Sequence, residues 1–283
     1  MLADLSCTGF RDDDHLALAA AVRPGVGLCT IVGIEGSFSR RLGAQLAVFP
    51  DGSTVGDLAD GCLERQLACD MANAEGPRII RYGRGSGKID FRLPCGGGVD
   101  ILLSPDPDRA EIRDALDTLE MRRPTSINLA AGDFLRKRTY IPSLRLAVLG
   151  EGPEVEAVDR LCEAMAIDVV LLRKEQLALG RAATNLTFDA FTACLLLFHD
   201  HEWELALLQP ALASQAFFIG AQGGDKARAD RTLALAARGV AEEEIARLTS
   251  PVGLIPGCKS PRTLALSAIS QIVDRYEQLR AVS

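Results

Sequence analysis

Two cysteines beside glycines are the residues of this sequence best suited to chemistry. Gly61-Cys62 stands at the expected start of a helix, where unpaired backbone N–H groups favour a thiolate over a thiol, although Asp60 and Glu64 oppose that shift. Cys95 lies in Pro94-Cys95-Gly96-Gly97-Gly98, whose glycines would expose the sulfur and the backbone amides. A reactive thiol is therefore predicted at both positions. The alternative is that each sulfur packs inside the protein.

Arginines accompany these thiols along the chain. Arg40-Arg41 precedes Gly43, and a second basic run follows at residues 78–92. Because a guanidinium group can bind two phosphate oxygens at once, an anionic ligand could be gathered here. The alternative is a solvated, charged strand face.

A third candidate is Gly150-x-Gly152, between an expected strand and an expected helix. Such a pair of glycines opens the turn that lets a backbone approach a pyrophosphate at a helix N-terminus. Val155 replaces the third glycine of that pattern, and Glu151 and Glu154 bring negative charge. A well-capped structural turn is therefore an equal alternative to nucleotide binding.

His199 and Asp200 follow an apolar strand at its carboxyl end, which is the usual ligand side of an open α/β sheet. They could position a proton-transfer group or a metal, and a hydrogen-bonded loop is the alternative. The chain has eight cysteines and no Cys-x-x-Cys pair, so reduced thiols are expected and a structural zinc site is not. Apart from Cys258, the other thiols are expected in the core.

Composition excludes several classes of function. The chain has 283 residues, 48% of them apolar, and can form two domains with real cores. Its net charge of -7 argues against binding to nucleic acid or to acidic lipid. No apolar run approaches the roughly 18 to 20 residues of a membrane span, and the acidic start is unlike a signal peptide. We therefore expect a cytoplasmic protein without a membrane segment.

The elements that must position these residues change character along the chain. Residues 1–104 predict an α+β domain with a mostly antiparallel sheet, with strands at 27–32, 45–49, 54–55, 78–82, 89–93 and 99–103 and a helix at 62–74. A helix at 108–121 opens a helical connector over 105–142.

Residues 143–283 alternate apolar runs with helical patterns. Strands are expected at 144–149, 169–172, 193–198 and 216–219, with helices between them and closing helices at 225–238 and 260–280. This alternation predicts a Rossmann-like, doubly wound parallel-sheet domain, so the whole chain is assigned to the α/β class.

The ordered motifs resemble those of the XdhC/CoxI family, which are accessory proteins of xanthine dehydrogenase and related molybdenum hydroxylases. The resemblance covers nearly the whole chain. The motifs that carry it are Gly36-Ser37-Phe38-Ser39-Arg40-Arg41-Leu42-Gly43, Pro50-Asp51-Gly52, Asp60-Gly61-Cys62-Leu63-Glu64, Arg81-Tyr82-Gly83, Pro94-Cys95-Gly96-Gly97, Val148-Leu149-Gly150-Glu151-Gly152, Phe198-His199-Asp200, Phe218-Ile219-Gly220-Ala221, Pro251-Val252-Gly253-Leu254 and Gly257-Cys258-Lys259-Ser260-Pro261.

This resemblance implies a protein that binds molybdenum cofactor and assists its sulfuration and its insertion into a xanthine dehydrogenase-type molybdenum hydroxylase. Thiolate is a soft ligand that suits a metal–sulfur centre, so Cys62 and Cys95 are expected to contact the metal or relay sulfur. Arg40, Arg41 and the loop amides would hold the pterin phosphate. The resemblance also implies a homodimer and a cysteine desulfurase as a further partner. The full set of expected cofactor-binding residues is Cys62, Cys95, Gly61, Gly96, Gly97, Arg40, Arg41, Gly150, Gly152, His199 and Asp200.

Departures from the family pattern indicate a divergent member. The family's Ser-Gly-Gly-Cys reads Ala59-Asp60-Gly61-Cys62, and its Gly-x-Gly-His reads Gly150-Glu151-Gly152-Pro153. In the second domain, several polar residues of the family's motifs are replaced here, whereas the apolar residues of those motifs are kept. Two alternatives therefore stand beside the chaperone: an NAD(P)-binding oxidoreductase that uses the Rossmann-like domain, and a non-catalytic interaction scaffold.

Overall fold

Apolar residues on both faces of one strand explain how the first half of the chain is layered. The computed structural model describes residues 12–59, 61–87, 96–172, 188–198 and 201–282. It divides into two units, Met1–Ile141 and Pro142–Ser283, which we treat separately. The first holds a five-stranded antiparallel sheet in the order β3-β2-β1-β5-β4. The strands are β1 (Gly27–Glu35), β2 (Gln45–Val48), β3 (Thr54–Gly56), β4 (Arg78–Gly83) and β5 (Gly98–Ser104).

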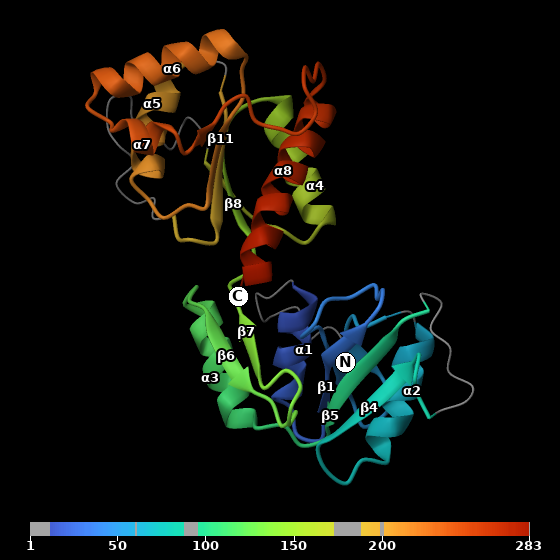
Figure 1. The fold of residues 1–283 in the computed structure, drawn as a ribbon. Helices are drawn as coiled ribbons and strands as arrows, with labels where there is room; N and C mark the ends of the chain where they lie inside the picture. The colour runs from blue at the N-terminus through green and yellow to red at the C-terminus, as the bar shows by residue number, and fades with distance from the viewer. Residues whose placement is uncertain (1–11, 60, 88–95, 173–187, 199–200, 283) are drawn as a thin grey trace. The chain divides into compact units, whose positions relative to one another are not determined.

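Each face of this sheet has its own core. Leu28 and Ala47 face α1 (Asp13–Ala21) and α3 (Arg109–Glu120), whereas Cys29 and Leu46 face α2 (Gly61–Ala72). Successive side chains of a strand point to opposite faces, so one short strand supplies both cores. Figure 1 shows α2 and the pair α1 and α3 on opposite sides of the sheet.

Residues 105–141 belong to the first unit, whereas the sequence predicted a separate helical connector over 105–142. The predicted helix is α3, and the hairpin of β6 (Thr125–Asn128) and β7 (Lys137–Tyr140) follows it. Ile127 and Tyr140 join the core beneath α1 and α3, which ties the segment to this unit. The predicted strand at 89–93 lies outside the described residues.

The second unit has a five-stranded parallel sheet in the order β12-β11-β10-β8-β9. Its strands are β8 (Arg145–Gly150), β9 (Asp168–Leu172), β10 (Thr192–Leu197), β11 (Phe218–Ala221) and β12 (Leu248–Thr249). Every residue of β10 is buried, because helices cover both faces of the sheet.

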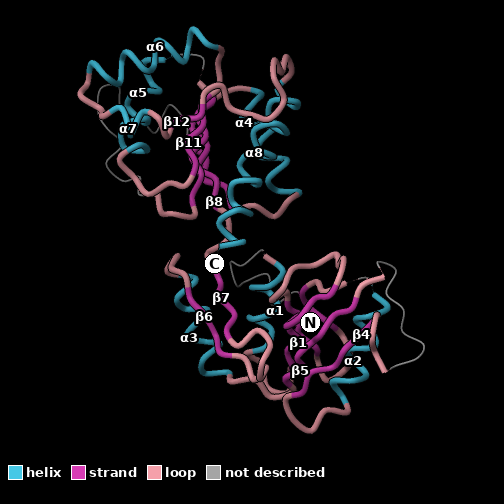
Figure 2. The backbone as a smooth tube through the Cα atoms, viewed as in Figure 1, coloured by secondary structure: helices cyan, strands magenta, loops and turns pink. Residues whose placement is uncertain are grey.

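Two groups of helices provide this cover. α4 (Pro153–Ala164) and α8 (Pro261–Val282) lie on one face, and α5 (His201–Leu212), α6 (Asp225–Ala237) and α7 (Glu242–Ile245) lie on the other (Figures 1 and 2). The predicted fold class, an antiparallel α+β unit followed by a doubly wound Rossmann-like unit, is confirmed. Of the helices in the described residues, none is long and apolar enough to cross a membrane.

Candidate functional site

Cys62 lies in the first turn of α2 and is exposed to solvent. Its direction follows from the helical period, because the buried stripe of Leu63, Leu67 and Met71 faces the sheet and turns the neighbouring positions outward. Arg65 Nη2 lies 3.4 Å from the Cys62 sulfur and donates to it. The structure thus presents an accessible thiol with a guanidinium group beside it.

A second exposed thiol, Cys69, lies two turns further along the same helix. The sequence had placed it in the core, which is wrong, because Cys69 does not fall on the buried stripe of α2. Cys29, Cys162 and Cys194 are buried as expected, and burial raises the pKa of each thiol. Cys258 is partly exposed.

The loop that carries the second predicted thiol can be followed only from Gly96, since Cys95 lies outside the described residues. Gly96 is exposed and has a φ of 70°, a conformation that favours glycine. A Cβ on Gly97 would lie 2.3 Å from the backbone oxygen of Ser37, so this glycine packs directly on the segment after β1. Arg84 N donates to Gly97 O over 2.9 Å, which fixes the loop from the other side.

Strand register places Gly98, which follows the glycine loop, beside the end of β1. Gly98, at the start of β5, pairs with Glu35, at the end of β1. Phe38 and Ala59, which belong to the loops after β1 and before α2, pack on the same core as Leu63. Within the described ranges, no cluster of three or more His, Cys, Asp or Glu side chains could hold a metal ion. A metal site at Cys62 and Cys95 stays a prediction.

Both predicted phosphate-binding arginines pair with carboxylates of the chain itself. Arg40 Nη2 lies 2.5 Å from Asp57 Oδ2, and Arg41 pairs with Asp14, which is buried. Asp14 also accepts from Arg138 Nη2 at 2.9 Å. Arg41 therefore anchors its loop to α1, and Arg138 of β7 shares the same carboxylate. A phosphate-binding role for Arg40 and Arg41 stays a prediction.

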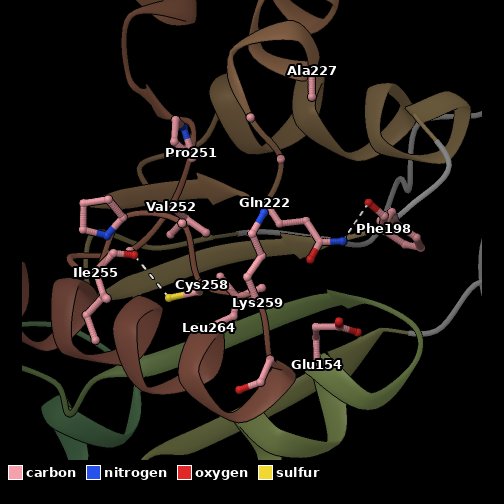
Figure 3. Close-up of a pocket in the computed structure, with 16 residues that line it drawn as sticks. Glu154, Phe198, Gln222, Ala227, Pro251, Val252, Ile255, Cys258, Lys259 and Leu264 are labelled. Atoms are coloured by element: carbon pink, nitrogen blue, oxygen red, sulfur yellow. Dashed lines mark hydrogen bonds between the residues drawn. The ribbon is translucent and has the colours of Figure 1, made fainter.

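The second unit contains a cavity of about 520 Å³ at the carboxyl ends of its strands (Figure 3). Phe198 and Gln222 line it directly after β10 and β11, and Glu154 lines it from the first turn of α4. Further lining comes from the segment that leads into α8, and this part includes Cys258 and Lys259. This position is where an open α/β sheet usually binds ligands.

The Gly150–Gly152 turn is built as the sequence predicted, and both glycines are required by its geometry. A Cβ on Gly150 would lie 2.5 Å from Leu197 O, and Gly152 has a φ of 91° before α4. Glu154 brings its carboxylate to the cavity at this turn. His199 and Asp200 lie outside the described residues, so their predicted roles are unchanged.

Sequence reasoning missed Gln222 and the Cys258–Ser260 wall as site residues. The signal for the wall was Gly257-Cys258-Lys259, which contributed to the family resemblance and was not assigned to the cofactor-binding set. Gln222 follows a short apolar strand, as His199 does, and the same carboxyl-end rule could have selected it.

The fold and these sites define a two-unit protein in which an antiparallel α+β unit with an exposed helix-end thiol precedes a Rossmann unit with a cavity. Residues 19–83 match the XdhC and CoxI family, and residues 146–272 match the XdhC Rossmann domain. The chain is 31% identical to the molybdenum cofactor insertion chaperone PaoD of Escherichia coli, over 94% of this chain and 90% of PaoD. It belongs to the XdhC/CoxI family.

Two further similarities are weaker. The uncharacterized protein YqeB of Escherichia coli is 25% identical over 87% of this chain, which spans 43% of YqeB. A solved structure described as a xanthine dehydrogenase from Bacillus halodurans has the same fold, with a TM-score of 0.72 and 19% identity, covering 95% of this chain and 96% of that one.

Proposed function

We propose that this protein binds molybdenum cofactor as its cargo and delivers it to an apo-enzyme of the xanthine dehydrogenase type. The observation that carries the proposal is the similarity to PaoD along nearly the whole chain, together with the exposed Cys62 thiol at the start of α2. The cytoplasm as its location and a homo-oligomeric state are further parts of this proposal.

The chemistry of the first unit supports this role. Thiolate sulfur is a soft ligand that suits a molybdenum–sulfur centre, and the Cys62 thiol is exposed. Arg65 places a positive charge next to the sulfur. The Arg40 side chain is 33% exposed, so its guanidinium group can also contact an anionic ligand.

The loop from Cys95 to Gly97 completes the proposed site. Its described part lies against the segment after β1, whose continuation carries Arg40 and Arg41. In our proposal Gly61, Gly96 and Gly97 offer backbone N–H groups to the pterin phosphate. The bound cofactor is protected while a partner such as a cysteine desulfurase supplies the sulfur for its sulfuration.

A cofactor-binding experiment with matched thiol variants tests the proposal. Purified protein is mixed with molybdopterin cofactor released from a molybdenum enzyme, passed through a desalting column, and assayed for bound molybdenum. Cys62→Ala should retain far less molybdenum than wild type. Cys69→Ala is the control, because it removes an exposed thiol from the same helix without touching the proposed site.

Delivery is measured separately, as the activity gained by an apo molybdenum hydroxylase after incubation with the loaded protein. Cys62→Ala and Cys95→Ala should lower this gain, and Cys69→Ala should not. Equal molybdenum retention by Cys62→Ala and Cys69→Ala would contradict a cargo-binding role for the helix-end thiol.

A further inference from the structure

The adjacent arginines Arg40 and Arg41 are equally exposed but have very different partners. The Arg41 guanidinium group pairs with Asp14, whose side chain is 6% exposed, whereas Arg40 pairs with Asp57, whose side chain is 40% exposed. The side chains of Arg40 and Arg41 themselves are 33% and 34% exposed. The carboxylate partner therefore decides how easily each arginine can turn to another anion.

Asp14 is the centre of a buried network and cannot release Arg41 without a cost in stability. Its Oδ2 atom also accepts from Arg138 Nη2 over 2.9 Å, and its Oδ1 atom accepts from Gln45 N over 3.1 Å. Arg138 in turn donates through Nε to Gly43 O over 2.8 Å, two residues after Arg41. A buried carboxylate that loses a charged donor is destabilised. Arg41 is therefore held in place together with the end of its loop.

The Arg40–Asp57 pair can open at little cost. Arg40 directs Nη2 to Asp57 Oδ2 and Nη1 to the backbone oxygen of Ser39, 3.1 Å away, so its two outer nitrogens serve different acceptors. Water can replace Arg40 at Asp57 because this carboxylate is exposed, and exposed ion pairs contribute little to stability. A phosphate group can accept two parallel N–H bonds from one guanidinium group. A phosphate can therefore displace Asp57 from Arg40.

The Arg40–Asp57 pair joins the loop after β1 to the segment that leads into α2. Asp57 precedes Cys62 by five residues. Leu58 N donates to Glu64 Oε1 over 3.4 Å, which ties this segment to the first turn of α2. An anion bound to Arg40 is therefore next to the segment that leads to the exposed thiol.

The carboxylates around Arg40 oppose the binding of an anion. Asp13 interacts electrostatically with both Asp57 and Arg40, and its pKa is raised by burial and by the negative charges of Asp12 and Asp57. These carboxylates repel an anion that Arg40 attracts. Asp57 is the one that pairs with Arg40, so its removal should have the largest effect on anion binding.

We propose that Arg40 contacts the phosphate of the cargo and that Asp57 is its resident counter-ion, which the phosphate displaces. Arg41 and Arg138 are positioning residues that hold the loop through Asp14 and do not touch the ligand. This assignment rests on the proposed function, because it concerns the same cofactor. It goes further by giving two adjacent arginines different roles.

Two forms of the cofactor test this assignment. Molybdopterin cofactor released from a molybdenum enzyme is used as such and after removal of its phosphate by alkaline phosphatase. Retention of molybdenum over a range of protein concentrations gives an apparent dissociation constant for each form. Wild type should bind the phosphorylated form about tenfold more tightly, since charge-assisted hydrogen bonds are lost with the phosphate. Arg40→Gln should lose most of this preference.

Asp57→Asn tests the counter-ion. Because it removes the competing charge, it should bind the phosphorylated form about threefold or more tightly than wild type, and the dephosphorylated form equally. Asp106→Asn is the matched control, because Asp106 is also an exposed carboxylate in an ion pair, with Arg109. Arg109 contacts the backbone oxygen of Arg23, after the end of α1, whereas Asp14 lies in the first turn of that helix. Asp106→Asn should leave both constants unchanged.

Asp14→Asn separates the two arginines. If Arg41 contacted the phosphate directly, weakening its carboxylate partner would tighten the phosphorylated form as Asp57→Asn does. No such tightening is expected, and a gain as large as that of Asp57→Asn would overturn the separation of roles. Arg138→Lys is the milder variant, since it keeps a charge for Asp14 and loses the planar fork that also reaches Gly43 O. It should reduce the preference for the phosphorylated form, and an unchanged preference would remove its positioning role.

Three results would overturn the assignment: equal binding of both forms by wild type, a full preference kept by Arg40→Gln, or binding of the phosphorylated form by Asp57→Asn that is no tighter than by Asp106→Asn. In each case, Cys62-dependent retention of molybdenum still supports the proposed function. A wild type that retains neither form contradicts the proposed function, and the assignment falls with it. The thermal unfolding midpoint of each variant separates a loss of the site from a loss of the fold.

Discussion

Arg231 and Glu204 form a buried ion pair inside the second unit. Arg231 Nε lies 2.6 Å from Glu204 Oε2 and Nη2 lies 2.8 Å from Oε1, and both side chains are at most 1% exposed. Arg231 also donates to Ser250 Oγ over 2.9 Å and to Gln222 O. One guanidinium group on α6 thus holds α5 and the two loops that carry Gln222 and Pro251 into the cavity.

Removing one partner of this pair is expected to be strongly destabilising. Arg231→Met removes the guanidinium group that pairs with the buried Glu204 carboxylate, so the free energy of unfolding should fall by about 3–5 kcal/mol. Trp203, the one tryptophan of the chain, lies on α5, and its fluorescence reports on this unit during urea unfolding. Arg145→Met is the control.

Arg145 pairs with Asp168 over 2.6 Å, but the two side chains are 38% and 43% exposed. An exposed pair contributes only about 0–1 kcal/mol, so Arg145→Met should change stability little. If Arg231→Met and Arg145→Met lowered the free energy of unfolding by similar amounts, burial would not be what makes the Arg231–Glu204 pair important.

The two neighbouring arginines of the first unit should differ in their effect on stability. Arg41 pairs with Asp14, which is 6% exposed, whereas Arg40 pairs with Asp57, which is 40% exposed. Arg41→Gln should therefore lower the free energy of unfolding by about 1–3 kcal/mol, because Asp14 loses a charged donor. Arg40→Gln should lower it by less than about 1 kcal/mol. Urea unfolding followed by circular dichroism measures both, and an unchanged stability of Arg41→Gln would argue for a ligand-binding role alone.

Alkylation should separate the thiols by their positions in the fold. Cys62 and Cys69 are exposed on α2 and should react quickly with iodoacetamide in the native protein. Cys29 and Cys194 should stay unmodified, since they are fully buried and burial raises the pKa of each thiol. Peptide mass mapping after a timed reaction gives the rate at each site. If Cys29 were modified as fast as Cys62, the core between the first sheet and α2 would have to open readily.

Stability of the second unit should decline at alkaline pH. Burial raises the pKa of the Cys162 thiol from 9.0 to about 12, and the charge of Asp159 adds to this effect. The unfolded thiol loses its proton at lower pH than the folded one, so its contribution is present below pH 9.0 and is lost as the pH rises toward about 12.

Urea unfolding at about pH 8 and about pH 10, followed by Trp203 fluorescence, measures this loss, which for one thiol is at most about 1.4 kcal/mol per pH unit. Cys162→Ala should show a smaller decline than wild type over the same interval. An equal decline would mean that Cys162 is not the group that titrates.

Local patterns were sufficient to predict most elements of both units. The four-residue spacing of Leu63, Leu67 and Met71 predicted α2, and these side chains are the ones that face the sheet. The β6–β7 hairpin escaped prediction, because Thr125–Asn128 has little apolar alternation and its place is set by the packing of Ile127 and Tyr140 on distant helices.

The sequence by itself determined the layers, the helix that carries Cys62 and the glycine turn after β8, since each depends on the spacing of side chains within a few residues. Only the tertiary structure decided that Arg41 joins Asp14 and that Gln222 faces Cys258 and Glu154 across a cavity. Polar side chains take partners from segments far away along the chain, and no local pattern records which of them folding will bring within hydrogen-bond distance.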